Sequence, residues 1–183
     1  IVIEANWVKN KINGLGKATT DEEVYEGEWK DNKPHGLGRH TRENGYKYEG
    51  ECRQGEKTGL GRLEEDGNIY EGDWLDERLD GLGIANYFNG DKYIGNWKDG
   101  KYHGKGIYIS QEQIYEGMWE YNNKNGFGRW FGVNGDCYSG SWKDNQQTGW
   151  GVYKSNDGTV YLSGIAFGKK YGKSIYQLII VLI

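Results

Sequence analysis

The chain of 183 residues has a formal net charge of −4 and contains 31 glycines, 15 tyrosines and 8 tryptophans, but one proline. This charge gives no electrostatic reason to expect nucleic acid as a partner, and the aromatic content is too high for a disordered coil. The scarcity of proline excludes collagen. Glycine costs backbone entropy in regular structure, so the aromatic rings must supply much of the compensating burial.

The chain opens inside a repeated unit. Trp7 precedes Gly14 by the same interval at which Trp29 precedes Gly36, so residues 1–24 form a partial first unit. The opening segment IVIEANW lacks the basic and apolar regions of a signal peptide. It also lacks a starting Met, which leaves open that the chain is a fragment or a processed product.

Six complete units follow, over residues 25–160. In each unit a five-residue segment that begins with Tyr is followed by a glycine pair, GxG, in constant register, and only the connector to the next unit varies in length. A fixed register with a variable connector indicates a structural repeat. The segments are YEGEW at Tyr25, YEGEC at Tyr48, YEGDW at Tyr70, YIGNW at Tyr93, YEGMW at Tyr115 and YSGSW at Tyr138.

Each unit has the pattern of a β-hairpin. In YEGEW the residues alternate, which places Tyr25 and Trp29 on one face of a strand and the acids on the other. A polar turn such as KDNKPH separates this strand from a second strand that carries the glycine pair. The connectors contain dipeptides suited to two-residue turns: Asn44-Gly45, Asp66-Gly67, Asn89-Gly90, Asn134-Gly135 and Asp157-Gly158.

Tandem hairpins joined by tight turns predict an all-β fold, an elongated single-layer antiparallel meander of about fourteen to sixteen strands. We expect a sheet of this length to twist into a groove. We also expect the Tyr and Trp rings to lie across the glycines of the neighbouring strand, where a Cβ would displace them. This arrangement explains why glycines and aromatic residues are abundant together.

The array ends in a degenerate unit at residues 161–173, and a hydrophobic tail occupies residues 174–183. Terminal units of a repeat array are expected to be atypical because they cap it. The aliphatic run is far shorter than the roughly 20 residues of a membrane helix, and it exceeds what one edge strand can bury on one face. We therefore expect it to dock on another chain through Leu178, Ile179, Ile180, Val181, Leu182 and Ile183.

From Trp7 to Gly172 this pattern resembles the MORN-repeat family, with Cys52 replacing Trp in one unit. The resemblance implies an elongated ribbon of hairpins without chemistry of its own. It also implies a scaffold of the kind found in ciliary radial spokes, cytoskeletal collars and membrane junctions, or a module beside lipid-kinase or SET-domain methyltransferase domains. A groove that holds a partner's helix is a further property of the family.

The residues predict no catalytic, cofactor or metal site. Glu26 and Glu28 recur as acid pairs in later units, which is typical of a soluble outer face. His35 and His103 share one turn position and read as structural, whereas His40 stands alone. No histidine has zinc-ligand spacing. Cys52 and Cys137 lie far apart and read as free thiols in a reducing compartment.

Two surfaces are candidates for binding. In a single-layer sheet no second layer covers the aromatic stripe, so part of it should stay accessible to a protein partner. The rings expected there are Tyr70, Trp74, Tyr93, Trp97, Tyr115 and Trp119. The rival is the turn edge, where basic and acidic residues are interleaved; anionic lipid would bind through Lys30, Lys33, Lys98 and Lys101.

These observations predict a non-enzymatic scaffold that needs no cofactor and binds other proteins within a larger assembly. We expect it in the cytoplasm, in a cilium, an axoneme of radial-spoke type or the cytoskeleton. One alternative is a membrane tether that binds phosphoinositide. Another is the repeat segment of a larger lipid kinase or SET-domain enzyme. Exposed strand edges would also allow copies of the chain to pair through the sheet ends or the tail.

Overall fold

The computed structural model describes the backbone of residues 1–166 and 169–171 and the side chains of residues 1–162. Within that part of the chain every regular element is a strand, and sixteen strands follow one another in chain order in one antiparallel sheet. The predicted all-β meander is therefore confirmed. The predicted docking tail, Leu178–Ile183, lies outside the described residues, as does part of the degenerate last unit.

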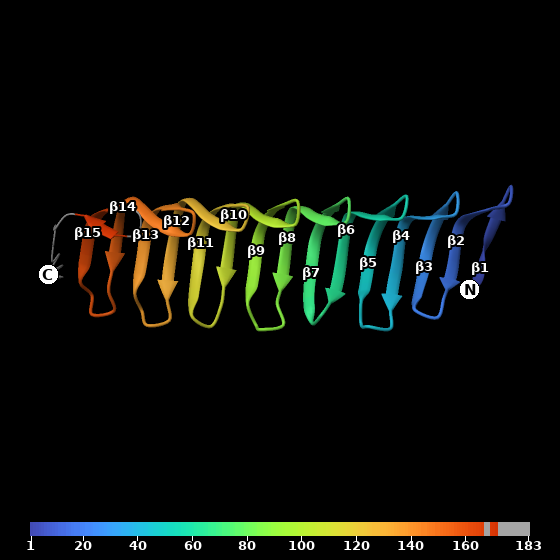
Figure 1. Ribbon diagram of the computed structural model, residues 1–183, viewed down its shortest axis with the longest axis horizontal. Helices are drawn as coiled ribbons and strands as arrows, with labels where there is room; N and C mark the ends of the chain where they lie inside the picture. Colours follow the sequence, from blue (N-terminus) through green and yellow to red (C-terminus); the bar gives the residue numbers. More distant parts are fainter. Residues whose placement is uncertain (167–168, 172–183) are drawn as a thin grey trace, which may run out of the picture. The chain divides into compact units, whose positions relative to one another are not determined.

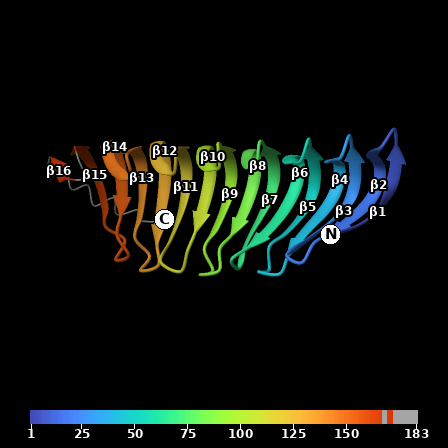
Figure 2. The same cartoon turned by 45° about the vertical axis from the view of Figure 1, so that its right-hand side comes forward.

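Short turns link neighbouring strands at alternating ends (Figures 1 and 2). The chain forms two compact units; the first is Ile1–Asn89 with Trp97–Gly100, and the second begins with Gly90–Asn96 and continues from Lys101. The first unit holds β1 Val2–Val8, β2 Lys11–Thr19, β3 Glu23–Lys30, β4 Lys33–Arg42, β5 Lys47–Arg53, β6 Glu56–Glu65, β7 Asn68–Leu75 and β8 Arg78–Asn86.

Strand β9, Lys92–Lys98, contributes residues to both units. The second unit continues with β10 Lys101–Ile109, β11 Gln113–Glu120, β12 Asn123–Gly132, β13 Cys137–Lys143, β14 Gln146–Lys154, β15 Val160–Ala166 and β16 Lys169–Tyr171. Each predicted hairpin of a repeat corresponds to one odd-numbered strand and the even-numbered strand after it, as in β3 and β4.

The turn inside each hairpin is tighter than predicted. The segment KDNKPH was expected to form the turn, but only Asp31 and Asn32 lie outside the strands, with φ of 51° and 70°. Two successive residues with positive φ form a type I′ turn, whose twist matches that of the flanking strands. The strands therefore run to Lys30 and from Lys33, which makes them longer than the sequence pattern indicated.

Three of the connectors between hairpins differ from the expected two-residue turns, and one matches them. Asp66 and Gly67 form such a turn, since both have positive φ between β6 and β7. At Asn44-Gly45 the loop has three residues instead: Gly45 donates its N–H to the Arg42 carbonyl, and Arg42 donates to Tyr46. The same hydrogen bonds recur around Asn134-Gly135 and Asp157-Gly158. In these loops only the glycine has positive φ, as in a type I turn closed by a glycine bulge.

A bulge interrupts six of the described hairpins at the residue that precedes the Trp position. In the β3–β4 pair, Gly27 faces Gly38 and Trp29 faces Pro34, so Glu28 alone faces three residues of β4. Gly36 lies in this bulge with φ of 70°, a conformation that favours glycine. The first glycine of the GxG pair is therefore required by the backbone, and the second by the ring that covers it.

Candidate functional site

One face of the sheet, here called the ring face, carries the repeated Tyr and Trp side chains. A Cβ added to Gly38 would lie 2.1 Å from the Tyr25 hydroxyl, and one added to Gly106 would lie 2.2 Å from that of Tyr93. Five Tyr rings thus lie across the second glycine of the neighbouring strand, which confirms the predicted role of these glycines, whereas Gly83 lies against Trp97 and not Tyr70. The close approach is possible only because these positions lack a side chain.

Backbone carbonyls hold the rings in place. The Tyr48 hydroxyl donates to the Glu51 carbonyl at 2.9 Å, and the same bond recurs from Tyr25, Tyr93, Tyr115 and Tyr138. The Trp74 indole N–H donates to the Gly61 carbonyl at 3.0 Å. Equivalent indole bonds are made by Trp29, Trp119 and Trp142. These bonds satisfy the polar atoms of the buried rings, as burial requires.

The expectation that the aromatic stripe stays accessible is wrong for most of the predicted groove residues. Of the six rings, Trp74, Trp97 and Trp119 are only 6% exposed, and Tyr93 and Tyr115 are fully buried. Tyr70 is half-buried. The rings cover themselves by packing edge-on against one another, as Tyr115 does on Trp142 at 5.2 Å. Their contact with a partner stays a prediction.

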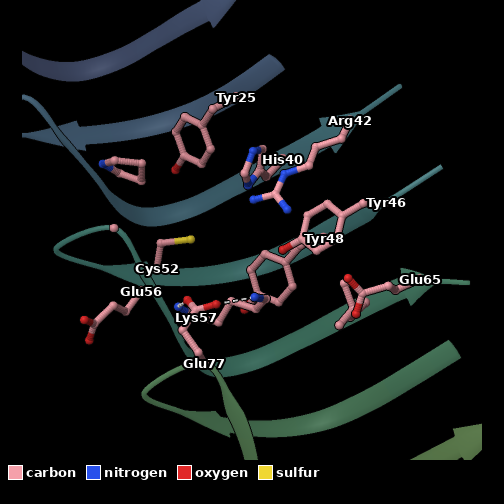
Figure 3. A pocket seen from close by; sticks show the side chains of 13 residues that line it. Tyr25, His40, Arg42, Tyr46, Tyr48, Cys52, Glu56, Lys57, Glu65 and Glu77 are labelled. Atoms are coloured by element: carbon pink, nitrogen blue, oxygen red, sulfur yellow. Dashed lines mark hydrogen bonds and ion pairs between the residues drawn. The ribbon is translucent and has the colours of Figure 1, made fainter. Parts of the chain in front are cut away.

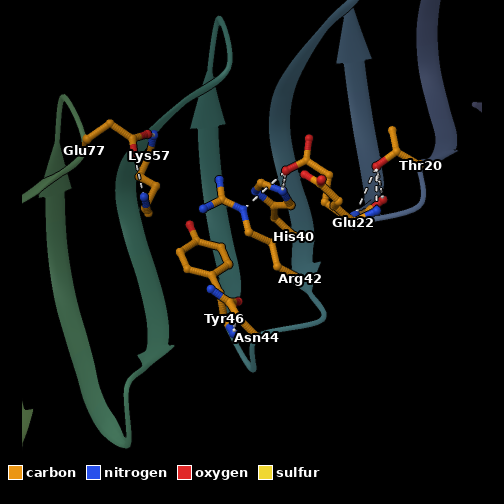
Figure 4. A network of polar contacts seen from close by, with 9 residues as sticks. Thr20, Glu22, His40, Arg42, Asn44, Tyr46, Lys57 and Glu77 are labelled. Atoms are coloured by element: carbon orange, nitrogen blue, oxygen red, sulfur yellow. Dashed lines mark hydrogen bonds and ion pairs between the residues drawn. The ribbon is translucent and has the colours of Figure 1, made fainter.

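Two lysines reach onto the ring face. Lys124 Nζ lies 4.8 Å from the centre of the Tyr115 ring and 5.1 Å from that of Trp142, and it donates to the Gln113 side-chain oxygen. Burial lowers the pKa of Lys124 to about 8. Lys57 occupies the matching position in the first unit, where it lies near the rings of Tyr48 and Trp74 and pairs with Glu77 (Figure 4).

A polar network that the sequence did not predict surrounds His40. Its Nε2 atom lies 2.9 Å from a Glu23 carboxylate oxygen that also accepts from Arg42 (Figure 4). The hydrogen bond with His40 is the main cause of the lowered pKa of Glu23. His40 has no counterpart in the other repeats, and the sequence predicted no partners for it, because the three residues meet only when β3 and β4 pair.

The acid row has a structural role beyond solubility. Asp73 Oδ2 accepts the Leu82 backbone N–H at 2.8 Å, and Glu28 and Glu51 accept from Leu37 and Leu60 in the same way. The donor in each case is the middle residue of a GxG pair, whose N–H the bulge removes from the strand ladder. The second acid of each pair therefore stabilises the bulge opposite it.

The opposite face, here called the leucine face, exposes a row of apolar side chains. They are the middle residues of the GxG pairs on β2, β4, β6 and β8, and they are 62 to 68% exposed. The row consists of Leu15, Leu37, Leu60 and Leu82. Register places acids on the same face, since Leu15 faces Glu28, Leu37 faces Glu51 and Leu60 faces Asp73. The sequence contained this signal in the recurring GLG, whose middle residue we expected on the face opposite the glycines but assigned no role.

On this face carboxylates stand level with the leucines, and acidic and basic residues alternate on either side of the row. Arg39 lies 3.5 Å from Glu49, and Arg62 is 2.7 Å from Glu71, so part of the acidic charge is paired. The carboxylates level with the leucines are Glu28, Glu51 and Asp73. The leucine face of the first unit thus combines evenly repeated apolar side chains with carboxylates between them.

The turn edge is closed by hydrogen bonds between successive hairpins. Asn32 donates its backbone N–H to the Ile12 carbonyl, and its side chain accepts the Ile12 N–H at 2.8 Å. Asn122 and Asn145 make the same pair of bonds in the second unit. The predicted lipid-binding residues Lys30, Lys33, Lys98 and Lys101 flank such turns and are exposed.

No site for chemistry is evident among the described residues. They contain no group of three or more His, Cys, Asp and Glu that could hold a metal ion, and no helix that is long and apolar enough to cross a membrane. Cys52 and Cys137 are both free. Burial raises the pKa of the Cys52 thiol, which keeps it protonated at neutral pH.

The MORN repeat family matches six segments of the chain, residues 4–20, 25–45, 70–92, 93–112, 115–137 and 138–160. These segments cover more than half of the sequence, so the chain belongs to the MORN repeat family. The matches do not include residues 46–69, the repeat in which Cys52 replaces Trp. No curated protein matches the chain. MORN repeats are a non-catalytic module and generally act as scaffolds for protein or membrane interactions.

Proposed function

We propose that this chain is a protein-interaction scaffold whose docking surface is the leucine face of its first unit. The exposed row Leu15, Leu37, Leu60 and Leu82 carries the proposal. Large apolar side chains that recur on one open face mark an interaction site more strongly than scattered ones do. The ring face offers less contact area because its rings are largely buried.

The occupant that fits this face is a basic amphipathic helix. The leucines stand on alternate strands, so successive side chains are roughly 9.6 Å apart. Residues seven positions apart on a helix are about 10.5 Å apart, which matches that interval. Lysines or arginines beside the apolar stripe would meet the acids that flank the row, and such charge complementarity favours the orientation and the rate of association.

The setting we propose is a ciliary or cytoskeletal assembly in the cytoplasm, by analogy with scaffolds built from the same repeat. The alternative, a tether to phosphoinositide, depends on the exposed lysines at the turn edge. These lysines alternate with acids such as Asp31 and Asp99. Membrane binding at about 1 kcal/mol per basic residue requires clusters without such interruption.

A pair of synthetic peptides tests this proposal against the lipid alternative. Both would form 24-residue helices with the same leucine stripe, one with lysines and the other with glutamates on the polar face. At physiological salt we expect the lysine peptide to bind with an affinity of about micromolar and the glutamate peptide to bind at least tenfold more weakly. Fluorescence anisotropy measures both.

Vesicles that contain phosphoinositide form the second arm, measured by co-sedimentation. The protein should stay in the supernatant. If it sediments with vesicles and binds neither peptide, the protein is a phosphoinositide tether and the scaffold proposal is wrong.

A further inference from the structure

The fifth strand lacks a ring that the other repeats possess. Cys52 faces Gly36 in the register in which Trp74 faces Gly59 and Trp142 faces Gly126. It therefore occupies the Trp position of its repeat. The thiol is far smaller than an indole, and a hollow remains beside it although Cys52 itself is buried.

In two of the other repeats the indole packs edge-on between two tyrosines. Trp119 lies edge-on to Tyr115 of its own repeat at 5.0 Å and to Tyr93 of the preceding repeat at 5.7 Å. Trp142 is held in the same way by two tyrosines at 5.2 and 5.4 Å. The tyrosines that would flank an indole at position 52 are Tyr25 and Tyr48.

A hollow of about 370 Å³ lies at this position. Tyr25, Tyr48 and Cys52 all line it, as Figure 3 shows. Its remaining apolar wall comes from Pro34, Tyr46 and Leu63. The volume falls at the small end of the range for ligand pockets, which is about 300–1,000 Å³.

The basic side chains that line the hollow are each paired with a carboxylate. Lys57 pairs with Glu77, and hydrogen bonds from Lys57 outweigh burial and lower the pKa of that carboxyl. Arg42 contacts Glu23 and lies 4.4 Å above the Tyr46 ring. A rim of this kind favours a neutral aromatic group over a phosphate.

The backbone also supplies a partner for an indole N–H. Trp142 donates to the carbonyl of Gly128, which stands two residues beyond the glycine that faces Trp142. The residue with the same relation to Cys52 is Gly38. The hollow thus lies between the tyrosines that would flank an indole, in a repeat whose register places Gly38 where Gly128 holds the indole of Trp142.

We infer that the hollow over Cys52 receives the indole ring of a tryptophan presented by a protein partner, so that the partner supplies the ring this repeat lacks. The inference rests on the proposed scaffold function in one respect, that the ring belongs to a protein. A tryptophan in a fitted pocket is a common source of interface energy, and here it would anchor a partner on the ring face of the first unit.

The probe for this site is N-acetyl-tryptophanamide, with N-acetyl-glycinamide as the matched control. In a titration followed by two-dimensional NMR, we expect saturable binding of the tryptophan probe with an affinity of about millimolar. The shifts should centre on Tyr25, Tyr48 and Leu63. Cys52→Ala should keep the binding, and Cys52→Trp should weaken it at least tenfold because the built-in ring fills the hollow.

A second measurement does not depend on how the tryptophan variant folds. In the unaltered protein the probe should slow alkylation of Cys52 by iodoacetamide and leave the rate at Cys137 unchanged. The inference is overturned if the probe protects neither cysteine or both equally, or if a folded Cys52→Trp variant binds the probe as well as the unaltered protein does. The lysine peptide is expected to bind the leucine face, which is opposite to the hollow. If the tryptophan inference fails, binding of that peptide should therefore persist, so the two proposals can fail separately.

Discussion

Individual side chains accept hydrogen bonds from backbone N–H groups of this sheet where a bulge interrupts the strand pairing. The Leu82 N–H, displaced by the bulge, is satisfied by Asp73 at 2.8 Å. A backbone donor that loses its acceptor weakens the folded state, and hydrogen bonds to charged groups contribute more than neutral ones. The carboxylates of the leucine face are therefore structural residues as well as the acidic border of the proposed docking row.

Replacement of Asp73 tests this role. Asp73→Ala should lower the free energy of unfolding by about 1–2 kcal/mol, because it removes the acceptor of the Leu82 N–H. Asp73→Asn keeps an oxygen in place and should lose less than half as much. Urea unfolding followed by tryptophan fluorescence measures both. Equal losses in the two variants would show that the negative charge, and not the hydrogen bond, stabilises the bulge.

The lowered pKa of Lys124 predicts that the stability of the protein depends on pH. Its pKa in the folded protein is about 8, below the value of 10.5 of an unperturbed lysine, so between these values the unfolded chain binds more protons. The free energy of unfolding should therefore rise from pH 8 towards 10.5 through this group. Lys124→Met removes the effect and should be more stable than the unaltered protein at pH 7, with an advantage that shrinks by pH 10.

The same urea experiment at pH 7 and pH 10 checks this prediction. Burial raises the pKa of Tyr115 and Tyr138, and their effect at high pH is common to both proteins, so it cancels in the comparison. The exposed Lys101→Met variant is the control and should show no such trend. An advantage of Lys124→Met that grows with pH would contradict the assignment.

At the scale of the strand and hairpin, the packing of each buried tyrosine depends on a glycine in the neighbouring strand. Gly106 leaves the space that the Tyr93 ring fills, and the ring hydroxyl bonds back to the Asn96 carbonyl at 2.9 Å. A side chain at position 106 would displace the ring and break that bond. The repeat therefore needs this glycine because of packing, and not because of an unusual φ.

Gly106→Ala should lower the free energy of unfolding by about 3 kcal/mol, since its Cβ would lie 2.2 Å from the Tyr93 hydroxyl. Gly158→Ala is the control: it meets open space at φ of 88° and should cost only about 1–2 kcal/mol through backbone strain. Thermal unfolding by circular dichroism ranks the two. Equal losses would mean that the ring moves aside without cost.

The sequence predicted the fold at this scale because the pattern repeats. Alternation in YEGEW and the recurrence of GxG were enough for the hairpins, the meander and the contact between rings and glycines. The bulge was not predicted, because Gly36 was read as alternating with Leu37 in a regular strand. The predicted length of the loop at Asn44-Gly45 was one residue too short, since the same dipeptide occurs in both two-residue and three-residue hairpin loops.

The candidate surfaces were harder to predict. Burial of Tyr93 and Tyr115 depends on how rings from successive hairpins cover one another, which one unit of sequence does not reveal. The leucine row was visible as GLG, and its middle residue was placed opposite the glycines, but no binding role was assigned to it. Cys52 was recognised as a departure from Trp, whereas the hollow that follows from it required the positions of Tyr25 and Tyr48.

For the whole molecule the two faces have different roles. The ring face holds the core of each unit, where Tyr and Trp side chains are buried against the glycines. The leucine face of the first unit leaves its large apolar side chains in solvent, bordered by carboxylates. A sheet of this design needs no second layer for its own core, and the exposed row is left for a partner.

The most direct test of this account measures binding of the lysine peptide to a variant with Leu37→Ser, Leu60→Ser and Leu82→Ser. These substitutions leave the charge of the protein unchanged and remove three apolar contacts, so affinity should fall at least tenfold at physiological salt. Phe88→Ser, at an exposed apolar residue in the connector after β8, is the control and should bind normally. If the triple variant, folded by circular dichroism, binds the peptide as well as the unaltered protein does, the leucine face is not the docking surface.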